Sequence, residues 1–259
     1  MGKVYLVGAG PGAPDLLTVR ATRILECADV VFHDALVHPE VLAIASRARI
    51  VPVGKRCSRI STDQRFINRA LVEAAARYGV VVRLKGGDPM VFGRAQEELD
   101  ALTAHGIDCE VVPGVTAALA AAAELKISLT RRGVSRSVVL ATPRIGTDEP
   151  PGRWADGVAA ADTAVLYMGV GEADLLSNAL IQAGMPGRTP VAVVQNASSP
   201  ACTTLHTTLQ DLPQSAAQLP PGGPTLLVLG EVLQPASHAQ HGDELGQPAH
   251  PTVAHAKRA

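Results

Sequence analysis

Aromatic residues are scarce in this chain of 259 residues, at 3% of the total, whereas hydrophobic residues as a whole make up 47%. The core must therefore be built from aliphatic side chains, and stacking platforms for nucleobases are not expected. The formal net charge of −1 argues against a general binder of nucleic acid or of membrane surfaces, although it leaves room for a local basic pocket. We therefore expect neither a nucleic-acid nor a membrane partner.

Cysteines are few and widely separated. The four thiols, at Cys27, Cys57, Cys109 and Cys202, form no CxxC pair, so neither a disulfide framework nor a zinc knuckle is predicted. Free thiols fit the reducing cytosol, and we expect a cytoplasmic location. No apolar run approaches the roughly 18 to 20 residues of a membrane span. The first apolar run also ends too early, at a Gly/Pro turn, to be a signal peptide.

Strand-like and helix-like patterns alternate through the first half of the chain. Buried β runs alternating with helices predict parallel βαβ units. The predicted strands are residues 3–7, 29–34, 49–54, 80–84 and 109–112, and the predicted helices are residues 16–28, a helix opened by the capping-box spacing at 61–64, and residues 94–105.

The motif "PGVT" at residues 113–116 marks a change of pattern. An alanine-rich helix follows at 117–126 and should pack closely against another element. Strands are predicted at 137–142, 163–168, 190–195 and 225–230, and the alternating segment 202–209 predicts an antiparallel edge hairpin. We therefore predict an α/β fold of two consecutive α/β domains, residues 1–114 and 115–234, with mainly parallel or mixed sheets.

The last segment, residues 235–259, is polar, rich in His, Pro and Ala, and without periodicity. It is expected to be a disordered tail. Its four histidines could bind a metal ion, but its composition favours a low-complexity tail over a metal site.

The glycine-rich motif "VGAGPGAPD" at residues 7–15 ends the first predicted strand. Gly8, Gly10 and Ala13 match the dinucleotide fingerprint GxGxxA. Pro11, however, removes an amide that a pyrophosphate would use, and Pro14 prevents an immediate helix. A sharp loop that receives an adenosine-type ligand by its shape fits better, and an ordinary βα turn remains the alternative.

Charged residues follow three of the predicted strands. Asp34 ends the strand 29–34, Lys55 follows 49–54, and the turn from Lys85 to Asp88 follows 80–84. In open α/β sheets ligands gather at the carboxyl ends of strands, which favours a functional role for each. The alternatives are a turn or helix-capping aspartate and a surface lysine.

The string "KGGDPMVFGR" at residues 85–94 combines a flexible turn with fixed charges. Gly86 and Gly87 permit close approach of a ligand, and Asp88 before Pro89 is held in an extended conformation. Arg94 begins the next helix, where the helix dipole disfavours a cation unless an anion meets it. Two further arginines, Arg131 and Arg132, suit a bidentate grip on carboxylates, and solvent-facing charge is the alternative for each arginine.

Three long segments together resemble the signatures of the uroporphyrinogen-III C-methyltransferases, which belong to the tetrapyrrole methylase superfamily. They are "VGAGPGAPDLLT" (7–18), "VVRLKGGDPMVFGRAQEEL" (81–99) and "VVPGVTAALAAAAELKISLTRR" (111–132). The resemblance implies transfer of two methyl groups from S-adenosylmethionine to C2 and C7 of uroporphyrinogen III. The product, precorrin-2, serves sirohaem and cobalamin biosynthesis. It also implies a cofactor cleft between two α/β domains, a homodimer, and no need of a metal ion.

The resemblance also assigns residues. Asp34 matches the proton acceptor and Lys55 the proton donor, and we expect Arg94, Arg131 and Arg132 to bind the eight carboxylates of the substrate. Because the first strand begins at Lys3, without the dehydrogenase and ferrochelatase segment that some members carry, the chain is expected to stop at precorrin-2. The residues expected to bind the cofactor are Pro11, Gly86, Gly87, Asp88, Val91, Thr116, Ala117, Met168 and Ala197.

Some positions depart from the pattern of that family. Met90 replaces a usual Phe, the sequence "SLTRR" (128–132) replaces "PLTHR", Pro143 and Arg144 replace Gly and His, and Ala197 replaces a Gly. One alternative is a related methyltransferase acting on a later corrin intermediate, on diphthine or on ribosomal RNA, but the intact KGGDPxVFGR string argues against it. Another is a non-catalytic tetrapyrrole-binding protein, which the altered loops of the second domain favour. A nicotinamide-dependent dehydrogenase is disfavoured by Pro11 and by the lack of a convincing catalytic His or Tyr set.

Overall fold

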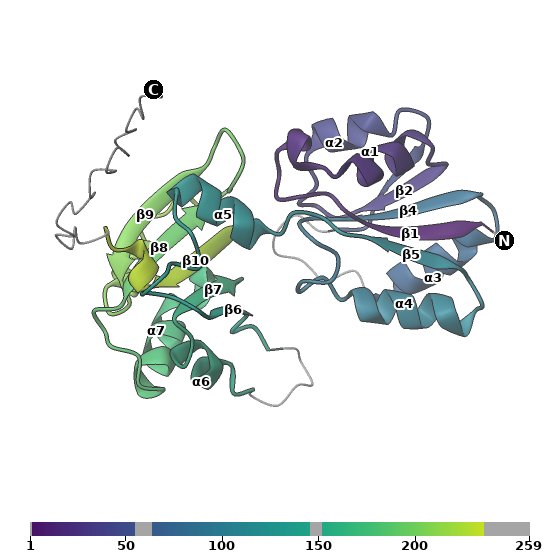
Figure 1. Ribbon diagram of the computed structural model, residues 1–259. Helices are drawn as coiled ribbons and strands as arrows, with labels where there is room; N and C mark the ends of the chain where they lie inside the picture. The colour runs from purple at the N-terminus through teal and green to yellow at the C-terminus, as the bar shows by residue number, and fades with distance from the viewer. Residues whose placement is uncertain (1, 55–63, 146–151, 236–259) are drawn as a thin grey trace, which may run out of the picture.

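The computed structural model describes residues 2–54, 64–145 and 152–235. Two five-stranded sheets follow one another along the chain, each with helices on both faces (Figure 1). We call β1–β5 with α1–α4 the first lobe, and β6–β10 with α5–α8 the second lobe. The α/β fold with parallel and mixed sheets is confirmed. The division into domains at residue 114 stays a prediction, and Lys55, residues 61–63 and nearly all of the predicted tail lie outside the described residues.

The first lobe is built on a parallel sheet, as the alternating pattern predicts. Its strand order is β3-β2-β4-β1-β5. Helices α1 and α2 cover one face and α3 and α4 the other (Figure 1). Both faces are buried, which explains the continuous apolar runs of its central strands. The strands are β1 (Lys3–Gly8), β2 (Val30–His33), β3 (Arg49–Pro52), β4 (Val80–Lys85) and β5 (Cys109–Val112), and the helices are α1 (Val19–Glu26), α2 (Pro39–Ile44), α3 (Gln64–Ala75) and α4 (Ala95–Ala104).

The second lobe has a mixed sheet with the order β6-β7-β10-β8-β9. Strands β6 and β7 pair in parallel, whereas the β7–β10, β10–β8 and β8–β9 pairs are antiparallel. The predicted antiparallel edge strand is confirmed, since β9 pairs with β8 at the edge. The elements are α5 (Ala117–Leu125), β6 (Val138–Ala141), α6 (Trp154–Ala159), β7 (Thr163–Tyr167), α7 (Ala173–Gln182), β8 (Pro190–Gln195), β9 (Thr203–Thr208), α8 (Leu212–Ala216) and β10 (Thr225–Gly230), and short 3-10 helices lie at Pro14–Leu16, Val170–Glu172 and Glu231–Leu233.

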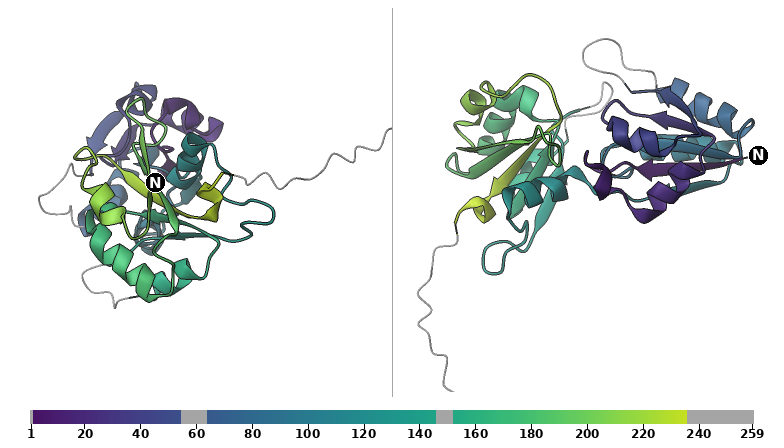
Figure 2. Two further views of the ribbon diagram at one scale, coloured as in Figure 1. Left: turned by 90° about the vertical axis from the view of Figure 1, so that its left-hand side faces the viewer. Right: turned by 90° about the horizontal axis from the view of Figure 1, so that it is seen from above.

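Helix α5 packs tightly on the second sheet, as its alanine content predicts. Ala118 and Ala121 are fully buried, in one cluster with Val165 and Val228 of the sheet. Small side chains let a helix approach a sheet closely at little cost in side-chain entropy. The opposite face of the sheet is covered by α6, α7 and α8 (Figures 1 and 2).

Three glycines bring the end of β1, the turn after β4 and the connection from β5 to α5 into backbone contact. A Cβ on Gly8 would lie 2.6 Å from the Cα of Gly114 and 2.7 Å from the carbonyl oxygen of Gly87. Only glycine fits where backbones approach so closely. The carboxyl ends of β1 and β4 therefore meet the strand-to-helix connection that leads into α5. These ends of the parallel strands point toward the second lobe (Figure 1). None of the helices in the described ranges is both long and apolar enough to span a membrane.

Candidate active site

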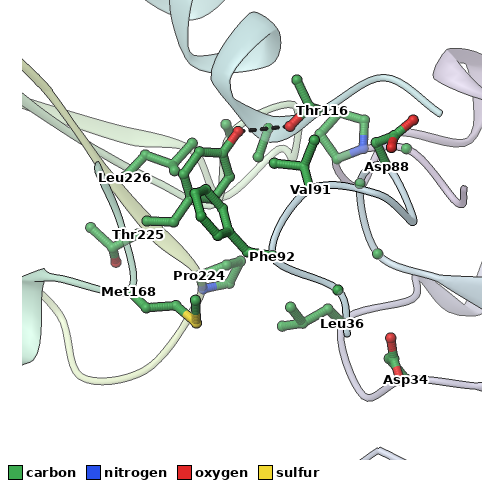
Figure 3. Close-up of a pocket in the computed structure, with 18 of the residues that line it drawn as sticks. Asp34, Leu36, Asp88, Val91, Phe92, Thr116, Met168, Pro224, Thr225 and Leu226 are labelled. Carbon is green, nitrogen blue, oxygen red and sulfur yellow. Dashed lines mark hydrogen bonds between the residues drawn. The ribbon is translucent and has the colours of Figure 1, made fainter. Parts of the chain in front are cut away.

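A cavity of about 500 Å³ lies between the two lobes (Figure 3). This size is typical of small-molecule sites. The first lobe supplies the turns that follow β1, β2 and β4, and the second supplies the start of α5, the ends of β7 and β8, and the segment entering β10. The lining residues are Gly10, Pro11, Asp34, Leu36, Lys85, Gly86, Gly87, Asp88, Val91, Phe92, Gly93, Thr116, Ala117, Tyr167, Met168, Val170, Val194, Ala197, Gly222, Gly223, Pro224, Thr225 and Leu226.

The turn after β4 is shaped by Gly87. Its amide donates to the carbonyl of Gly10 (2.7 Å) and its carbonyl accepts from the Gly10 amide (3.2 Å). Its φ of +67° lies in the left-handed region that favours glycine. A Cβ there would face the start of α5, 3.9 Å from the Ala117 nitrogen and 4.0 Å from the Thr116 Cα. Glycine thus keeps open a cradle between this turn and α5.

Asp88 has a structural task within the cavity wall. Its Oδ1 accepts from the Met90 amide (2.8 Å), and its Oδ2 accepts from the Gly114 amide (2.9 Å). The carboxylate therefore ties the turn after β4 to the connection that enters α5. Its predicted cofactor contact stays a prediction, and any ligand would meet a carboxylate whose two oxygens already hold backbone amides.

Tyr167 organises the wall on the side of the second lobe. Its hydroxyl shares a hydrogen bond with Thr116 Oγ1 (2.7 Å) and accepts from the amide of Ala118 (3.2 Å), near the N-terminus of α5 (Figure 3). Burial raises the pKa of the Tyr167 phenol, so the hydroxyl stays protonated at neutral pH. The Phe92 ring of the first lobe lies 4.9 Å, centroid to centroid, from the Tyr167 ring. These aromatic rings join the two lobes across the cavity.

We expect Tyr167→Phe to weaken binding of S-adenosylhomocysteine about 2- to 10-fold, because one hydrogen bond contributes about 0.5–1.5 kcal/mol. The variant keeps the ring contact with Phe92 but leaves Thr116 and the Ala118 amide without their shared partner. Isothermal titration calorimetry checks the affinity. Tyr78→Phe, outside the cavity, is the matched control, and equal affinities of the two variants would contradict this role of Tyr167.

Asp34 stands at the edge of the cavity nearest to the end of β2. Its Oδ1 accepts from Arg83 Nη2 (2.6 Å), and its side chain is 30% exposed. Behind it, Arg83 and Lys85 of β4 are paired with the fully buried Glu98 of α4. Burial, together with the neighbouring Arg83 cation, lowers the pKa of Lys85. Removing one partner from such a buried ion pair typically costs about 3–5 kcal/mol.

The structure brings most of the predicted site residues together. All nine residues expected to bind the cofactor line this one cavity, and Asp34 lines it too. Lys55 lies outside the described residues. Within the described part of the chain, no group of three or more His, Cys, Asp or Glu side chains is placed to hold a metal ion.

The three arginines expected to bind substrate do not line the cavity. Arg94 forms a bidentate ion pair with Glu97 (2.7 and 2.8 Å) just beyond the cavity-lining Gly93. The Arg131 guanidinium donates to two backbone carbonyls of the C-terminal segment, at Glu231 and Gln234 (both 2.9 Å). Arg132 is exposed. Arg131 therefore anchors the loop after α5 to the end of the second lobe.

Several cavity residues were not singled out from the sequence: Leu36, Phe92, Tyr167 and the segment from Gly222 to Leu226. The string "PPGGP" at 220–224 was the available signal for the last of these, since paired glycines before a buried strand mark a special turn. Backbone strain also marks the cavity wall. Phe92 and Met168, which line the cavity, and Asn196, which precedes the lining Ala197, have positive φ values between 51° and 59°.

The geometry defines a class of protein in which two α/β lobes hold a small ligand at the carboxyl edge of a parallel sheet. Residues 3–213 match the family described as Tetrapyrrole (Corrin/Porphyrin) Methylases. The chain belongs to this family.

Named relatives are similar over most of this chain. A uroporphyrinogen-III C-methyltransferase of Pseudomonas aeruginosa is 45% identical over 231 residues, which cover 89% of this chain and 94% of the relative. A siroheme synthase of Pseudomonas paraeruginosa is 45% identical over 236 residues, 90% of this chain, but the match spans only half of that protein. A crystal structure of the uroporphyrin-III C-methyl transferase from Thermus thermophilus, complexed with S-adenyl homocysteine, superposes with a TM-score of 0.79. It is 40% identical, and the match covers 90% of this chain and 99% of that one.

Proposed function

We propose that this chain is an S-adenosylmethionine-dependent C-methyltransferase that methylates uroporphyrinogen III at C2 and C7 to give precorrin-2. One observation carries the proposal: the nine residues that sequence similarity assigns to the cofactor come from both lobes and line a single cavity. The similarity to a solved enzyme that binds S-adenyl homocysteine supports the same conclusion.

The cavity suits an adenosyl ligand. The glycine cradle at Gly87 leaves room beside the start of α5, and Val194 and Leu226 supply an apolar wall. When bound, S-adenosylmethionine supplies a methyl group already activated on a sulfonium. The contribution of the protein is to hold the two reactants in line. Their translational and rotational entropy is then lost on binding and no longer adds to the barrier of the methyl transfer.

Asp34 is the proposed proton acceptor. One of its oxygens is held by Arg83, and the other remains for the proton that leaves the methylated macrocycle. Lys55 is the proposed proton donor, in agreement with the sequence resemblance.

Arg94 is the proposed anchor for a substrate carboxylate at the mouth of the cavity. We expect Arg94→Ala to raise the KM for uroporphyrinogen III by about tenfold or more, because hydrogen bonds to charged groups contribute about 1.5–3 kcal/mol. Affinity for S-adenosylhomocysteine should stay close to that of the wild type. Arg153→Ala is a matched control, since Arg153 forms a comparable i,i+3 pair with Asp156 away from the cavity. Joint loss of substrate and cofactor binding would contradict the assignment.

The proposal also includes a cytoplasmic homodimer, in agreement with the resemblance. Light scattering of the purified protein tests the oligomeric state.

The main rival is methylation of a later corrin intermediate. Anaerobic initial rates with methyl-labelled S-adenosylmethionine separate the two. We expect label to enter uroporphyrinogen III much faster than a later corrin acceptor, and the opposite preference would overturn the proposal.

A further inference from the structure

Four charged side chains form a cluster in the first lobe, at the cavity wall (Asp34 and Lys85) and behind it (Arg83 and Glu98). The Glu98 side chain is 0% exposed, and those of Arg83 and Lys85 are each 3% exposed. Asp34 lines the cavity, and its side chain is much more exposed than the other three, at 30%. Two cations balance two carboxylates, as burial of so much charge requires.

Glu98 is the centre of this cluster. Its Oε1 accepts from Arg83 Nε (2.9 Å) and from Gln64 Nε2 (3.1 Å), and its Oε2 accepts from Lys85 Nζ (3.0 Å). Gln64 in turn donates to Asn68 (3.0 Å). The carboxylate of one helix residue thus joins α3, α4 and β4, and it does not line the cavity itself.

The Arg83 guanidinium is held at three nitrogens. Nε donates to Glu98, Nη1 donates to the carbonyl of Leu84 (3.1 Å), and Nη2 donates to Asp34 Oδ1 (2.6 Å). Because the guanidinium is planar, fixing Nε and Nη1 also fixes the direction in which Nη2 donates. The position of Arg83, and with it the direction of the Asp34 carboxylate, therefore depends on Glu98.

The main chain of Asp34 is also fixed, which leaves the side chain as the part still to be oriented. Its amide donates to Leu84 (3.3 Å), and its carbonyl accepts from the Val37 amide (3.3 Å) and contacts His33 Nδ1 (2.9 Å). Across the described ranges, the side-chain anchor that the structure gives Asp34 is Arg83, and no donor lies on Oδ2. Oδ2 is the oxygen that can meet a substrate.

We propose that Glu98 is a positioning residue for methyl transfer: it holds Arg83, and Arg83 aims the Asp34 carboxylate into the cavity. The inference rests on the proposed role of Asp34 as proton acceptor. Glu98 touches neither ligand. It acts through geometry and through its charge, which balances one of the two cations beside Asp34.

The charge of Glu98 makes the proposal testable by the pH dependence of kcat, because general damage to the fold would not shift that dependence in a defined direction. Among the described residues, the charged and titratable groups around Asp34 are His33 of β2, Arg83 and Lys85 of β4, and Glu98 of α4, with the neutral Gln64 of α3 beside Glu98. Glu98→Gln leaves an uncompensated cation, which favours the ionised acceptor, so the acid limb of the kcat profile should move to lower pH. Arg83→Gln removes the cation, so the same limb should move to higher pH.

The first measurement is the anaerobic pH–rate profile of both variants. We expect the plateau kcat of Glu98→Gln to fall about tenfold or more, because a misaimed and weaker base loses much of the usual gain of general-base catalysis. The Kd for S-adenosylhomocysteine and the KM for uroporphyrinogen III should stay close to those of the wild type. Asp100→Asn, an exposed carboxylate on the same helix, is the matched control. In an Asp34→Asn background, Glu98→Gln should cause little further loss of kcat.

The second measurement does not depend on turnover. A crystal structure of Glu98→Gln with S-adenosylhomocysteine should show the Arg83 guanidinium shifted and the Asp34 carboxylate, still paired with it, turned from its position. If Glu98→Gln does not fold, Glu98→Asp, which keeps the charge but shortens the reach, takes its place and should show the same displacement with the acid limb unmoved. The proposal would be overturned if Asp34 keeps its position in the crystal structure and the acid limbs of the Glu98→Gln and Arg83→Gln profiles shift in the same direction. A wild-type protein that does not methylate uroporphyrinogen III would overturn the proposed function, whereas the crystal structures would still decide whether Glu98 orients Asp34.

Discussion

Replacing Asp34 with Asn is expected to reduce kcat by about 10²- to 10⁴-fold, the usual contribution of a positioned acid or base. The substitution preserves the shape of the side chain and leaves an oxygen that can still accept from Arg83. It removes the ability to take up a proton at neutral pH. Anaerobic single-turnover experiments with uroporphyrinogen III measure the loss, and calorimetry with S-adenosylhomocysteine should give an affinity close to that of the wild type.

Asp15→Asn provides the control for this experiment. Asp15 is an exposed carboxylate in the same lobe that does not line the cavity, so its replacement should leave turnover unchanged. If Asp34→Asn retains nearly full turnover, the proton acceptor is another group and the role given to Asp34 is wrong. If the variant loses cofactor affinity as strongly as turnover, Asp34 supports the cavity rather than the chemistry.

Replacing Gly87 with Ala is expected to weaken binding of S-adenosylhomocysteine by about 10- to 100-fold, or about 1.4–2.8 kcal/mol. The new methyl group would meet no protein atom closer than 3.9 Å, so the fold can accept it. It would, however, enter the cradle beside Thr116 and Ala117, which the ligand is expected to occupy. The backbone φ of +67° adds strain of about 1–2 kcal/mol to the folded state.

Gly106→Ala separates these two effects. Gly106 has nearly the same conformation, with φ of +65°, and a Cβ there would meet nothing within 4 Å. Both variants should therefore lose similar thermal stability, measured by calorimetric melting, but only Gly87→Ala should lose ligand affinity. Equal affinities of the two variants would show that the cradle does not hold the cofactor.

The sequence predicted the first lobe better than the second. The strands of the first lobe are continuous apolar runs separated by helices, and this alternation leaves a parallel sheet as the natural arrangement. The second lobe combines one parallel pair with antiparallel neighbours. Its strand order depends on which edges meet after folding, and local periodicity carries no information about that choice. Short helices such as α2 and α8 were not assigned individually, because a few residues give too weak a periodic signal.

The site was predictable where its residues lie in contiguous motifs. The turns at Pro11 and at Gly86–Asp88 bring glycines to strand ends, and strand ends meet at one edge of the sheet. The hydrogen bond between Thr116 and Tyr167 was not predictable in this way, because the two residues are 51 positions apart and meet only in the folded chain. Arg131 shows the converse. Its charge suggested a substrate carboxylate, but backbone carbonyls about 100 residues further along accept its hydrogen bonds.

The most direct test of the central claim is the mass of the product formed from uroporphyrinogen III and S-adenosylmethionine under anaerobic conditions. The proposed function predicts a product heavier by two methyl groups, with the absorbance of a dimethylated tetrapyrrole, and S-adenosylhomocysteine released in a ratio of two to one. An unchanged mass, despite tight binding of S-adenosylmethionine in the cavity, would contradict methylation of this substrate.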